Sequence, residues 1–263
     1  MPHTVLLTID SRGIATVMLN RPEKHNAFNA ELIRTLSETL EQLEKRPDIR
    51  VMVITGAGTS FCAGGDLEHM QRMSQATDTE NFSDALAVAR CMRKLHEFSK
   101  PVIARINGHA FGGGVGLIAC ADIAIASSAA RFALSEVKLG LAAATISPYV
   151  TAALGPRQTG RLLLTAEVMD AQRALQLGLI HRHIDAQQLD QAIEAEIQLL
   201  LQGGPQAQQA SKALLREIST KTSEQSDVLM ARTARVLTQL RSSDEGREGL
   251  SAFLEKRKPN WAH

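Results

Sequence analysis

The most constraining feature of this sequence is a pattern that occurs twice: a short apolar strand followed by a glycine-rich loop. Val51–Thr55 leads into the loop Gly56–Asp66, and Val102–Ile106 leads, through Asn107, into Gly112–Gly114. A nearly continuous apolar run of this length is typical of a buried strand. A helical pattern follows each loop. The repeated strand–loop–helix unit therefore predicts an α/β fold with its functional groups at the strand ends.

Alternation, caps and breaking residues predict the other elements. Strands are expected at Val5–Ile9, Ile14–Leu19, Ile123–Ala126, Arg131–Ala133 and Ile180–Ile184. Helices are expected after the cap Asn29, from Ser83 or Asp84 to Lys100-Pro101, over Ala171–Leu177 after the cap Asp170, over Gln187–Leu201, and beyond Gln206. Pro148 and Gly155-Pro156 predict short, broken helices after Gly140. The polar stretch Glu68–Asn81 is a candidate flap over a pocket.

Composition excludes several classes of protein. The chain has 263 residues, of which 44% are hydrophobic, and it can therefore bury a substantial core. A net charge of +1 without a long basic run argues against nucleic-acid binding. The sequence has no apolar run near the ~18 residues that span a bilayer, and we expect no membrane segment. Three cysteines without metal-type spacing favour a reduced, cytoplasmic protein with no metal site.

The two glycine loops and one acid suggest acyl or enolate chemistry. A glycine loop that opens a helix presents free backbone N–H groups, which suit an anion or a developing oxyanion. The spacing of Gly112–Gly114 is not a dinucleotide fingerprint, because Leu117 stands where that motif needs glycine. The loop Cys62–Asp66 is a second bend with little side-chain bulk, so the two loops can aim one N–H each at a single carbonyl oxygen. Glu136 lies among apolar residues, where desolvation raises a carboxyl pKa and favours proton transfer.

Other polar residues near these loops have simpler structural interpretations. Asp66 and Asp122 are expected to accept hydrogen bonds from backbone N–H groups. Cys62 has no evident base beside it, so loop packing is the expected role rather than nucleophilic attack. Alternatives to structural or surface roles are proton transfer by His69 or His109, water orientation by Ser147 or Tyr149, and contact of Lys138 or Arg72 with a distal substrate carboxylate.

At this point the chain resembles the enoyl-CoA hydratase/isomerase (crotonase) superfamily along nearly its whole length. The motifs that carry the resemblance are Asn20-Arg21-Pro22, His25-Asn26-Ala27, Phe61–Leu67, Lys100–Ala104, Asn107-Gly108, Phe111–Gly114, Ala121-Asp122-Ile123, Phe132, Glu136, Gly140, Glu248-Gly249 and Phe253–Arg257. They occur in the order of the family.

The resemblance implies a spiral of ββα units over residues 1–203 and a helical trimerisation or lid region over residues 204–263. It also implies assembly as a trimer or a dimer of trimers. The substrate would be a coenzyme A thioester, with no separate cofactor. Backbone N–H groups of Gly65 and Gly113 would form the oxyanion hole, and Glu136 would be the acid/base. The residues expected to contact CoA are Ala27, Ala63, Gly64, Asp66, Leu67, Gly112, Phe253 and Lys256.

One departure from the family pattern leaves the reaction open. Typical hydratases of the family carry a first glutamate two residues after the glycine triplet, where this chain has Gly116. Two carboxylates can share one water, whereas one must act as both acid and base. We therefore weigh hydration of an enoyl-CoA, double-bond isomerisation with Glu136 as the sole proton shuttle, and a non-catalytic acyl-CoA-binding scaffold.

A finer resemblance favours hydration. The runs Phe132–Leu141 and Ala144–Val150 are similar to a bacterial subgroup of methylglutaconyl-CoA or isohexenylglutaconyl-CoA hydratases, which also has glycine at the first acid position. Ala142-Ala143 departs from the Ile-Pro of that subgroup. The expected activity is thus that of a lyase acting on an enoyl-CoA, with a branched or carboxylated acyl group as one possibility.

Overall fold

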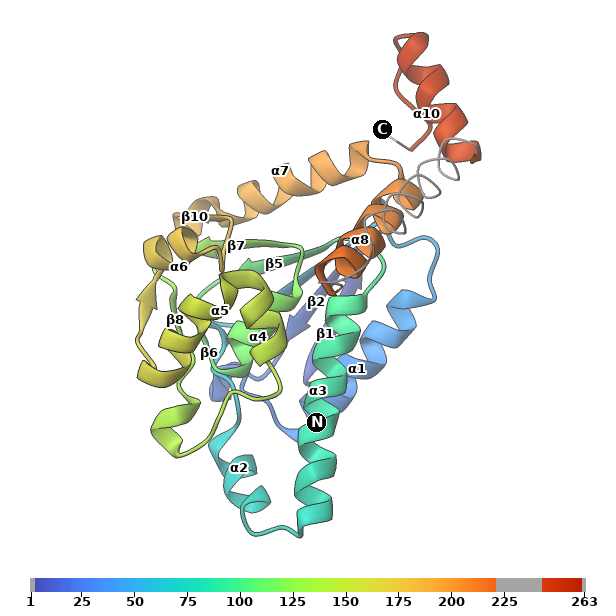
Figure 1. Cartoon of the computed structure of the whole chain (residues 1–263). Helices are drawn as coiled ribbons and strands as arrows, with labels where there is room; N and C mark the ends of the chain where they lie inside the picture. Colours follow the sequence, from blue (N-terminus) through green and yellow to red (C-terminus); the bar gives the residue numbers. More distant parts are fainter. Residues whose placement is uncertain (1–2, 221–242, 262–263) are drawn as a thin grey trace. The chain divides into compact units, whose positions relative to one another are not determined.

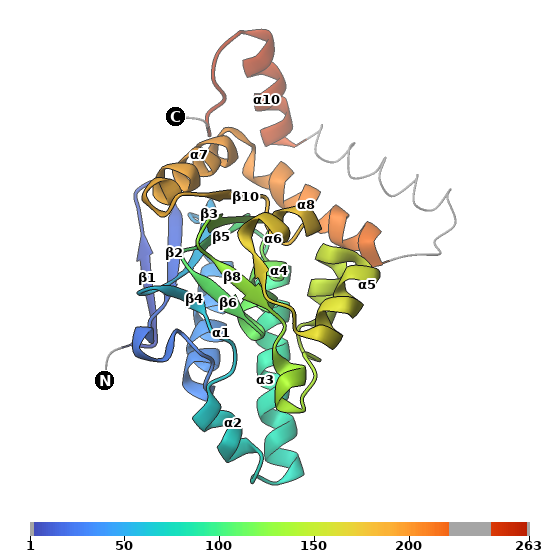
Figure 2. The same cartoon turned by 90° about the vertical axis from the view of Figure 1, so that its left-hand side faces the viewer.

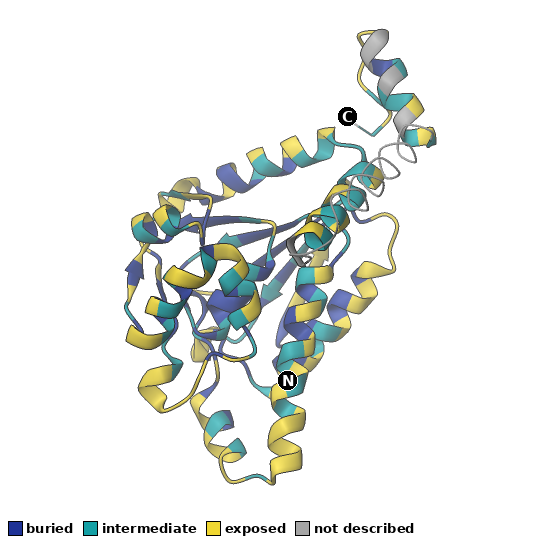
Figure 3. Cartoon of the chain, in the orientation of Figure 1, coloured by how far each residue is buried: buried dark blue, intermediate teal, exposed yellow. Residues whose placement is uncertain are grey.

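A six-stranded sheet forms the core of the computed structural model, which describes residues 3–220 and 243–261. Its strands in spatial order are β1 (Val5–Ile9), β2 (Ile14–Leu19), β3 (Val51–Gly56), β5 (Val102–Ile106), β7 (Ile123–Ser127) and β10 (Arg182–Ile184). β1 and β2 pair antiparallel, and every other neighbouring pair is parallel. β3 is buried along its whole length, as its nearly continuous apolar sequence predicts, and Figure 3 shows that the strands at the centre of the fold are mainly buried.

A second sheet of four short strands repeats the same order. It contains β4 (Ser60–Cys62), β6 (His109–Phe111), β8 (Arg131–Ala133) and β9 (Met169–Asp170). The chain alternates between the sheets, because β3 continues into β4, β5 into β6 and β7 into β8. Each pair is followed by helical structure, and the next pair lies beside it (Figures 1 and 2). This confirms the predicted α/β spiral of ββα units, and it makes the two glycine loops neighbours.

The chain divides into two compact units. The first contains both sheets and consists of Met1–Phe98 and Val102–Ile193. Its helices are α1 (Ala30–Glu44), α2 (Leu67–Met73), α3 (Asp78–Glu97), α4 (Gly113–Cys120), α5 (Ser147–Thr165) and α6 (Ala171–Leu177), with 3-10 segments η1 (Pro22–Lys24), η2 (Glu136–Leu139) and η3 (Ala186–Gln188). As predicted, Asn29 caps α1: its side chain accepts a hydrogen bond from the backbone N–H of Leu32 (2.9 Å).

Two sequence expectations differ from the structure. β4 and β6 lie within stretches that the sequence suggested were loops. α3 begins at Asp78 rather than at Ser83 or Asp84, because Thr77 and Glu80 form a capping box. The proposed flap is therefore α2 and the first turn of α3. The break expected at Gly155-Pro156 is confirmed: Gly155 has a φ of 74° and a ψ of 157°, outside the helical range, so α5 consists of two helical segments joined at a kink.

The second unit consists of Ser99–Pro101 and Glu194–His263, and its described secondary structure is helical. It contains most of α7 (Leu189–Gln202), followed by α8 (Pro205–Thr220) and α10 (Asp244–Leu254). The predicted boundary at residue 203 and the trimerisation or lid role of residues 204–263 stay predictions. Within the described ranges, no helix is long and apolar enough to cross a membrane.

Candidate active site

The first glycine loop leaves β4 and turns at Gly64 and Gly65. Gly64 has a φ of 89°, and a Cβ there would lie 2.9 Å from the carbonyl oxygen of Phe111, so only glycine fits. The backbone N–H of Phe28 donates to the carbonyl oxygen of Gly64 (2.6 Å), and that of Asp66 donates to the carbonyl oxygen of Phe28 (2.8 Å). Among the described residues, the N–H of Gly65 between these bonds has no hydrogen-bond partner.

The second glycine loop lies directly beside the first. Gly112, with a φ of 48°, joins β6 to α4, and its N–H donates to the carbonyl oxygen of Ala133 (2.8 Å). Gly113 is the first residue of α4, where a backbone N–H has no partner within the helix. A Cβ on Gly64 would lie 3.5 Å from the nitrogen of Gly113. The two loops therefore bring two unpaired N–H groups to one place.

Glu136 brings its carboxyl group to the same glycines. Glu136 is the first residue of η2, which follows β8. A Cβ on Gly112 would lie 2.8 Å from Oε1 of Glu136. The Oε2 atom is buried without a hydrogen-bond partner. Burial raises the pKa of Glu136 above its usual range, opposed by a hydrogen bond from its own backbone. A carboxyl group with a raised pKa is a stronger base than an exposed one, which suits proton transfer.

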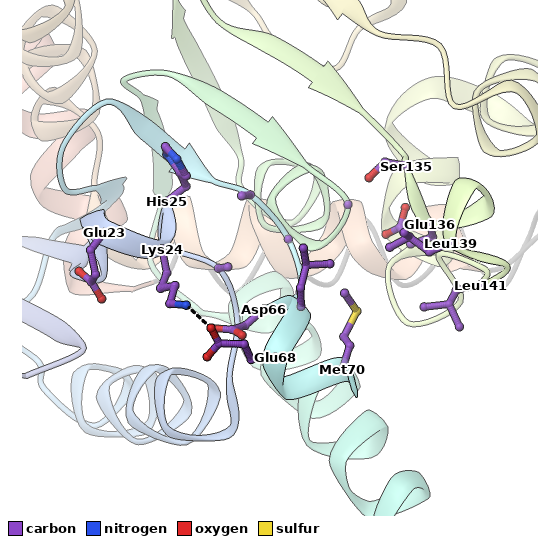
Figure 4. A pocket seen from close by; sticks show the side chains of 16 residues that line it. Glu23, Lys24, His25, Asp66, Glu68, Met70, Ser135, Glu136, Leu139 and Leu141 are labelled. Atoms are coloured by element: carbon purple, nitrogen blue, oxygen red, sulfur yellow. Dashed lines mark hydrogen bonds and ion pairs between the residues drawn. The ribbon is translucent and has the colours of Figure 1, made fainter. Parts of the chain in front are cut away.

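A cavity of about 410 Å³ opens beside the two loops. Figure 4 shows Glu136, Leu139 and Leu141 on one side of it and Lys24 and Glu68 on the other. Its lining contains these residues expected from the sequence: Ala27, Ala63, Gly64, Gly65, Asp66, Leu67, Gly112 and Glu136. The structure thus brings most of the predicted substrate contacts together around one space.

A second cavity, of about 250 Å³, also borders Glu136. It shares Gly65, Met70, Glu136 and Leu141 with the first cavity, and it adds Gly113. Its other walls come from α1, α2, α3 and the segment before α5, and they are mainly apolar: Phe28, Ile33, Ala85, Val88, Ala142, Ala143 and Ile146. The acid and the two unpaired N–H groups therefore lie where the two cavities meet.

A buried ion pair anchors the first loop. Arg21 Nη2 donates to Asp66 Oδ2 (2.8 Å), and Arg21 Nη1 donates to the carbonyl oxygen of Ala27 (2.6 Å). Burial alone would raise the pKa of Asp66, but hydrogen bonds from Arg21 and from the backbone N–H of His69 hold it below its usual range. Asp66 also caps α2, which confirms its expected role toward the backbone. Lys24 and Glu68 form a second, exposed pair nearby (2.6 Å).

The other candidates are distributed more widely. His69 lines the second cavity, whereas His109 accepts a hydrogen bond from the backbone N–H of Arg131 (3.1 Å). Ser147 donates to the carbonyl oxygen of Ala143 (2.7 Å), and Tyr149 stacks at a tilt against His96. Residues outside the lining of both cavities are His109, Ser147, Tyr149, Arg72, Lys138 and Asp122.

The remaining expectations concern Cys62 and the C-terminal CoA contacts. Cys62 is buried, and burial raises the pKa of its thiol to about 12, which suits packing rather than nucleophilic attack. Asp122 accepts a hydrogen bond from the backbone N–H of Val102 (2.8 Å), as expected of a loop residue. Lys256 belongs to the second unit, and the side chain of Phe253 lies outside the described part of the chain. Their contacts with CoA stay predictions.

Several lining residues were not predicted as part of the site, including Met70, Asp84 and Ile146. The sequence pattern predicts the start of this helix at Ser83 or Asp84, whereas α3 begins at Asp78. The spacing Thr77-x-x-Glu80 is a capping-box signal that could have corrected this and placed Asp84 inside a helix. Within residues 3–220 and 243–261, no group of three or more His, Cys, Asp or Glu residues could hold a metal ion.

Comparison with known proteins gives a consistent result. The sequence profile of the family "Enoyl-CoA hydratase/isomerase" matches residues 10–263. The crotonyl-CoA hydratase of Syntrophomonas wolfei is 32% identical over 99% of both chains, and the 2,3-dehydroadipyl-CoA hydratase of Escherichia coli is 32% identical over 97% of this chain and 98% of its own.

The structural similarity is equally extensive. The crystal structure of an enoyl-CoA hydratase from Shewanella pealeana superposes with a TM-score of 0.93 at 41% identity, covering 98% of this chain and 96% of its own. The match thus includes both sheets, both glycine loops and the segment that carries Glu136. On its sequence and its crotonase fold, this chain belongs to the enoyl-CoA hydratase/isomerase family of enzymes.

Proposed function

We propose that this enzyme is a lyase that adds water to an α,β-unsaturated acyl-CoA. The observation that carries the proposal is the arrangement of Glu136 with the unpaired N–H groups of Gly65 and Gly113 where two cavities meet. In this arrangement the thioester carbonyl oxygen accepts one hydrogen bond from each of the two N–H groups. The CoA arm follows the first cavity past Ala27, Ala63 and Leu67, and the acyl chain enters the second.

The N–H pair stabilises the negative charge that develops on the thioester oxygen as water attacks the β-carbon. Backbone donors cost no reorganisation at that moment, and removing one typically lowers a rate by about 100- to 1,000-fold. Glu136 takes a proton from the water and delivers a proton to the α-carbon. Because burial raises its pKa, the carboxyl group can hold the proton between these two events.

The second cavity favours a short or branched acyl group. Its volume of about 250 Å³ and its apolar walls fit a few carbon atoms beyond the thioester. The named substrates of the two hydratases that are 32% identical differ, being a crotonyl and a dehydroadipyl thioester. The sequence resemblance of residues 132–150 supports a methylglutaconyl-type acyl group for this chain.

A thioester panel tests the proposal directly. Purified enzyme is mixed with crotonyl-CoA, methylglutaconyl-CoA and 2,3-dehydroadipyl-CoA, and the loss of enoyl-thioester absorbance is followed. At least one absorbance should fall with wild type and stay constant with Glu136→Gln. An unchanged absorbance for the whole panel, with enzyme that binds CoA thioesters, would contradict the proposal.

Double-bond isomerisation is the second candidate, and one observation favours it. α4 carries no carboxylate beside the cavity, since its position for the first family glutamate is Gly116. In that reaction Glu136 moves a proton between two carbons and no water is added. Turnover in oxygen-18 water separates the two, because only hydration places the label in the product.

We also propose that the enzyme forms homotrimers or dimers of trimers in the cytoplasm and needs no separate cofactor. The motif order of the family supports the assembly, and the three cysteines, buried and free, suit a reducing compartment. Light scattering coupled to size-exclusion chromatography would measure the assembly. A monomeric mass would contradict it.

A further inference from the structure

The position of the missing acid on α4 is filled by another side chain. A Cβ on Gly116 would lie 2.3 Å from Cγ2 and 2.8 Å from Cβ of Ile146. Both residues are buried, and Ile146 lines the second cavity. Ile146 therefore occupies the space through which a glutamate at position 116 would have to reach the substrate. A second carboxylate, if the reaction uses one, must come from another element.

α3 supplies such a carboxylate to the same cavity. Asp84 and Glu136 are the two acidic residues that line it. The Asp84 side chain is 25% exposed, so it is half-enclosed and still reachable by water. Its Oδ1 lies 2.9 Å from His69 Nε2, whereas its Oδ2 has no hydrogen-bond partner within the described part of the chain. Oδ1 is thus hydrogen-bonded to His69, and Oδ2 is free to accept a hydrogen bond from a water molecule.

His69 is placed to orient this carboxylate. Its side chain is 11% exposed, and its backbone N–H donates to Asp66 Oδ1 (3.1 Å) at the start of α2. With Nε2–H donating to Asp84, Nδ1 is left as an acceptor, which Arg72 Nη2 approaches at 3.5 Å. The imidazole therefore links α2, next to the first glycine loop, to α3. The same imidazole limits how Asp84 can rotate.

We propose that Asp84, oriented by His69, is the second carboxylate of the active site and holds the attacking water opposite Glu136. The proposal rests on the hydration function proposed above and names the group that replaces an acid on α4. Asp84 contacts the water and is thus a catalytic residue, whereas His69 is a positioning residue. Other carboxylates nearby are engaged: Asp66 with Arg21, and Glu68 with Lys24.

The step balances without any further reactant. The water oxygen forms the bond to the β-carbon, and the π electrons of the C=C bond move into the thioester enolate held by the two N–H groups. One water proton goes to the Glu136 carboxylate, which then delivers it to the α-carbon. The other hydrogen stays on the new hydroxyl group and is hydrogen-bonded to Asp84 Oδ2. Both carboxylates end as they began.

Two reactions of the same enzyme separate this role from a structural one. The first reaction is hydration of whichever CoA thioester of the panel the wild-type enzyme consumes, and it needs a positioned water molecule. Exchange of the α-protons of butyryl-CoA with D₂O, followed by NMR, needs Glu136 and the two N–H groups but no water addition. The variants are Asp84→Asn, His69→Leu, His69→Gln and Glu136→Gln. Asp78→Asn is the matched control, because it makes the same change at an exposed position in the first turn of the same helix.

Asp84→Asn should lower the hydration kcat by about 100-fold, because the attacking water loses the carboxylate that positions it, and leave α-proton exchange near wild type. His69→Leu should lower hydration by about 10- to 100-fold through misplacement, and His69→Gln, which keeps a donor, should recover part of it. Asp78→Asn should be unchanged in both reactions, and Glu136→Gln should lose both.

Wild-type hydration by the Asp84 and His69 variants would overturn the role of the pair while leaving the proposed function intact. Equal losses of hydration and exchange in Asp84→Asn would also overturn it, because they would show a general disturbance of the pocket. An enzyme that exchanges α-protons through Glu136 but hydrates no panel thioester would refute the hydration function itself, and the water-holding role with it.

Discussion

Replacing Asp66 by Asn tests whether one buried ion pair holds the first glycine loop in place. The change preserves side-chain size and an oxygen for the backbone N–H of His69, but it removes the charge opposite Arg21. The two side chains are 13% and 6% exposed, so the guanidinium would lose its partner with little access to water. Breaking a buried pair in this way costs about 3–5 kcal/mol. At an m-value of about 2–3 kcal/mol/M, a cost of about 3 kcal/mol lowers the urea midpoint by roughly 1–1.5 M.

Urea unfolding followed by circular dichroism measures the effect. Glu68→Gln is the matched control, because it removes the carboxylate of the neighbouring exposed pair, whose side chains are 41% and 69% exposed. Exposed pairs contribute little to stability, so this midpoint should stay within the scatter of wild type. Equal midpoints for Asp66→Asn and Glu68→Gln would refute the reasoning that the Arg21–Asp66 pair anchors the loop.

The same pair predicts a dependence of stability on pH. The folded-state pKa of Asp66 is below its unfolded value because Arg21 and the His69 N–H outweigh the effect of burial. The stabilisation is therefore present above the unfolded pKa, about 3.9, and is lost as pH falls through the folded value. The difference in midpoint between wild type and Asp66→Asn should shrink in that acidic range. A difference that stays constant into strong acid would contradict this assignment.

Further predictions concern Glu136, Gly116 and Cys62. Glu136→Gln should lower hydration by about 10²- to 10⁴-fold. Because burial raises the pKa of Glu136, the native state loses stability as pH rises through that value, and the Gln variant should unfold at a higher urea concentration at about pH 8. Gly116→Ala should destabilise by about 1–3 kcal/mol through overpacking against Ile146, and Ile146→Ala should reduce that cost in a double-mutant cycle, whereas additive midpoints would contradict the contact. Cys62, with a thiol pKa of about 12, should resist alkylation in the folded protein and react only in denaturant, as mass spectrometry of the labelled peptides would show.

The longer strands and capped helices could be predicted from the sequence because their signals are local. β3 and β5 are mainly apolar runs, and Asn29 and Asp170 cap helices at the positions that the sequence predicted. β4 and β6 have three residues each, too few for any periodicity to be visible. They exist because the parallel ladder between them pairs residues nearly fifty positions apart, such as Ser60 with His109. A strand that depends on a pairing partner so distant along the chain cannot be predicted from the residues around it.

The glycines and the acid of the site could be predicted, but the walls of the second cavity could not. Gly64 and Gly112 have positive φ angles and little room for a Cβ, so both positions require glycine, which is visible in the sequence. The absence of an acid at Gly116 was visible in the sequence, whereas the reason was not, since Ile146 reaches that position from thirty residues away. Likewise His69 and Asp84 meet only after α2 and α3 have packed.

The ladder between β4 and β6 has a consequence for how this enzyme can change. The strands pair at Ser60–His109 and Cys62–Ala110, and the loops that follow them carry Gly65 and Gly113. Paired strands lie about 4.8 Å apart, a spacing that main-chain hydrogen bonds determine and that no side-chain substitution can adjust. Substitutions of side chains should therefore leave the width of the gap between the two loops, where we propose that the thioester oxygen binds, nearly unchanged. New substrates can arise through changes in the cavity walls while the chemistry at the thioester stays the same.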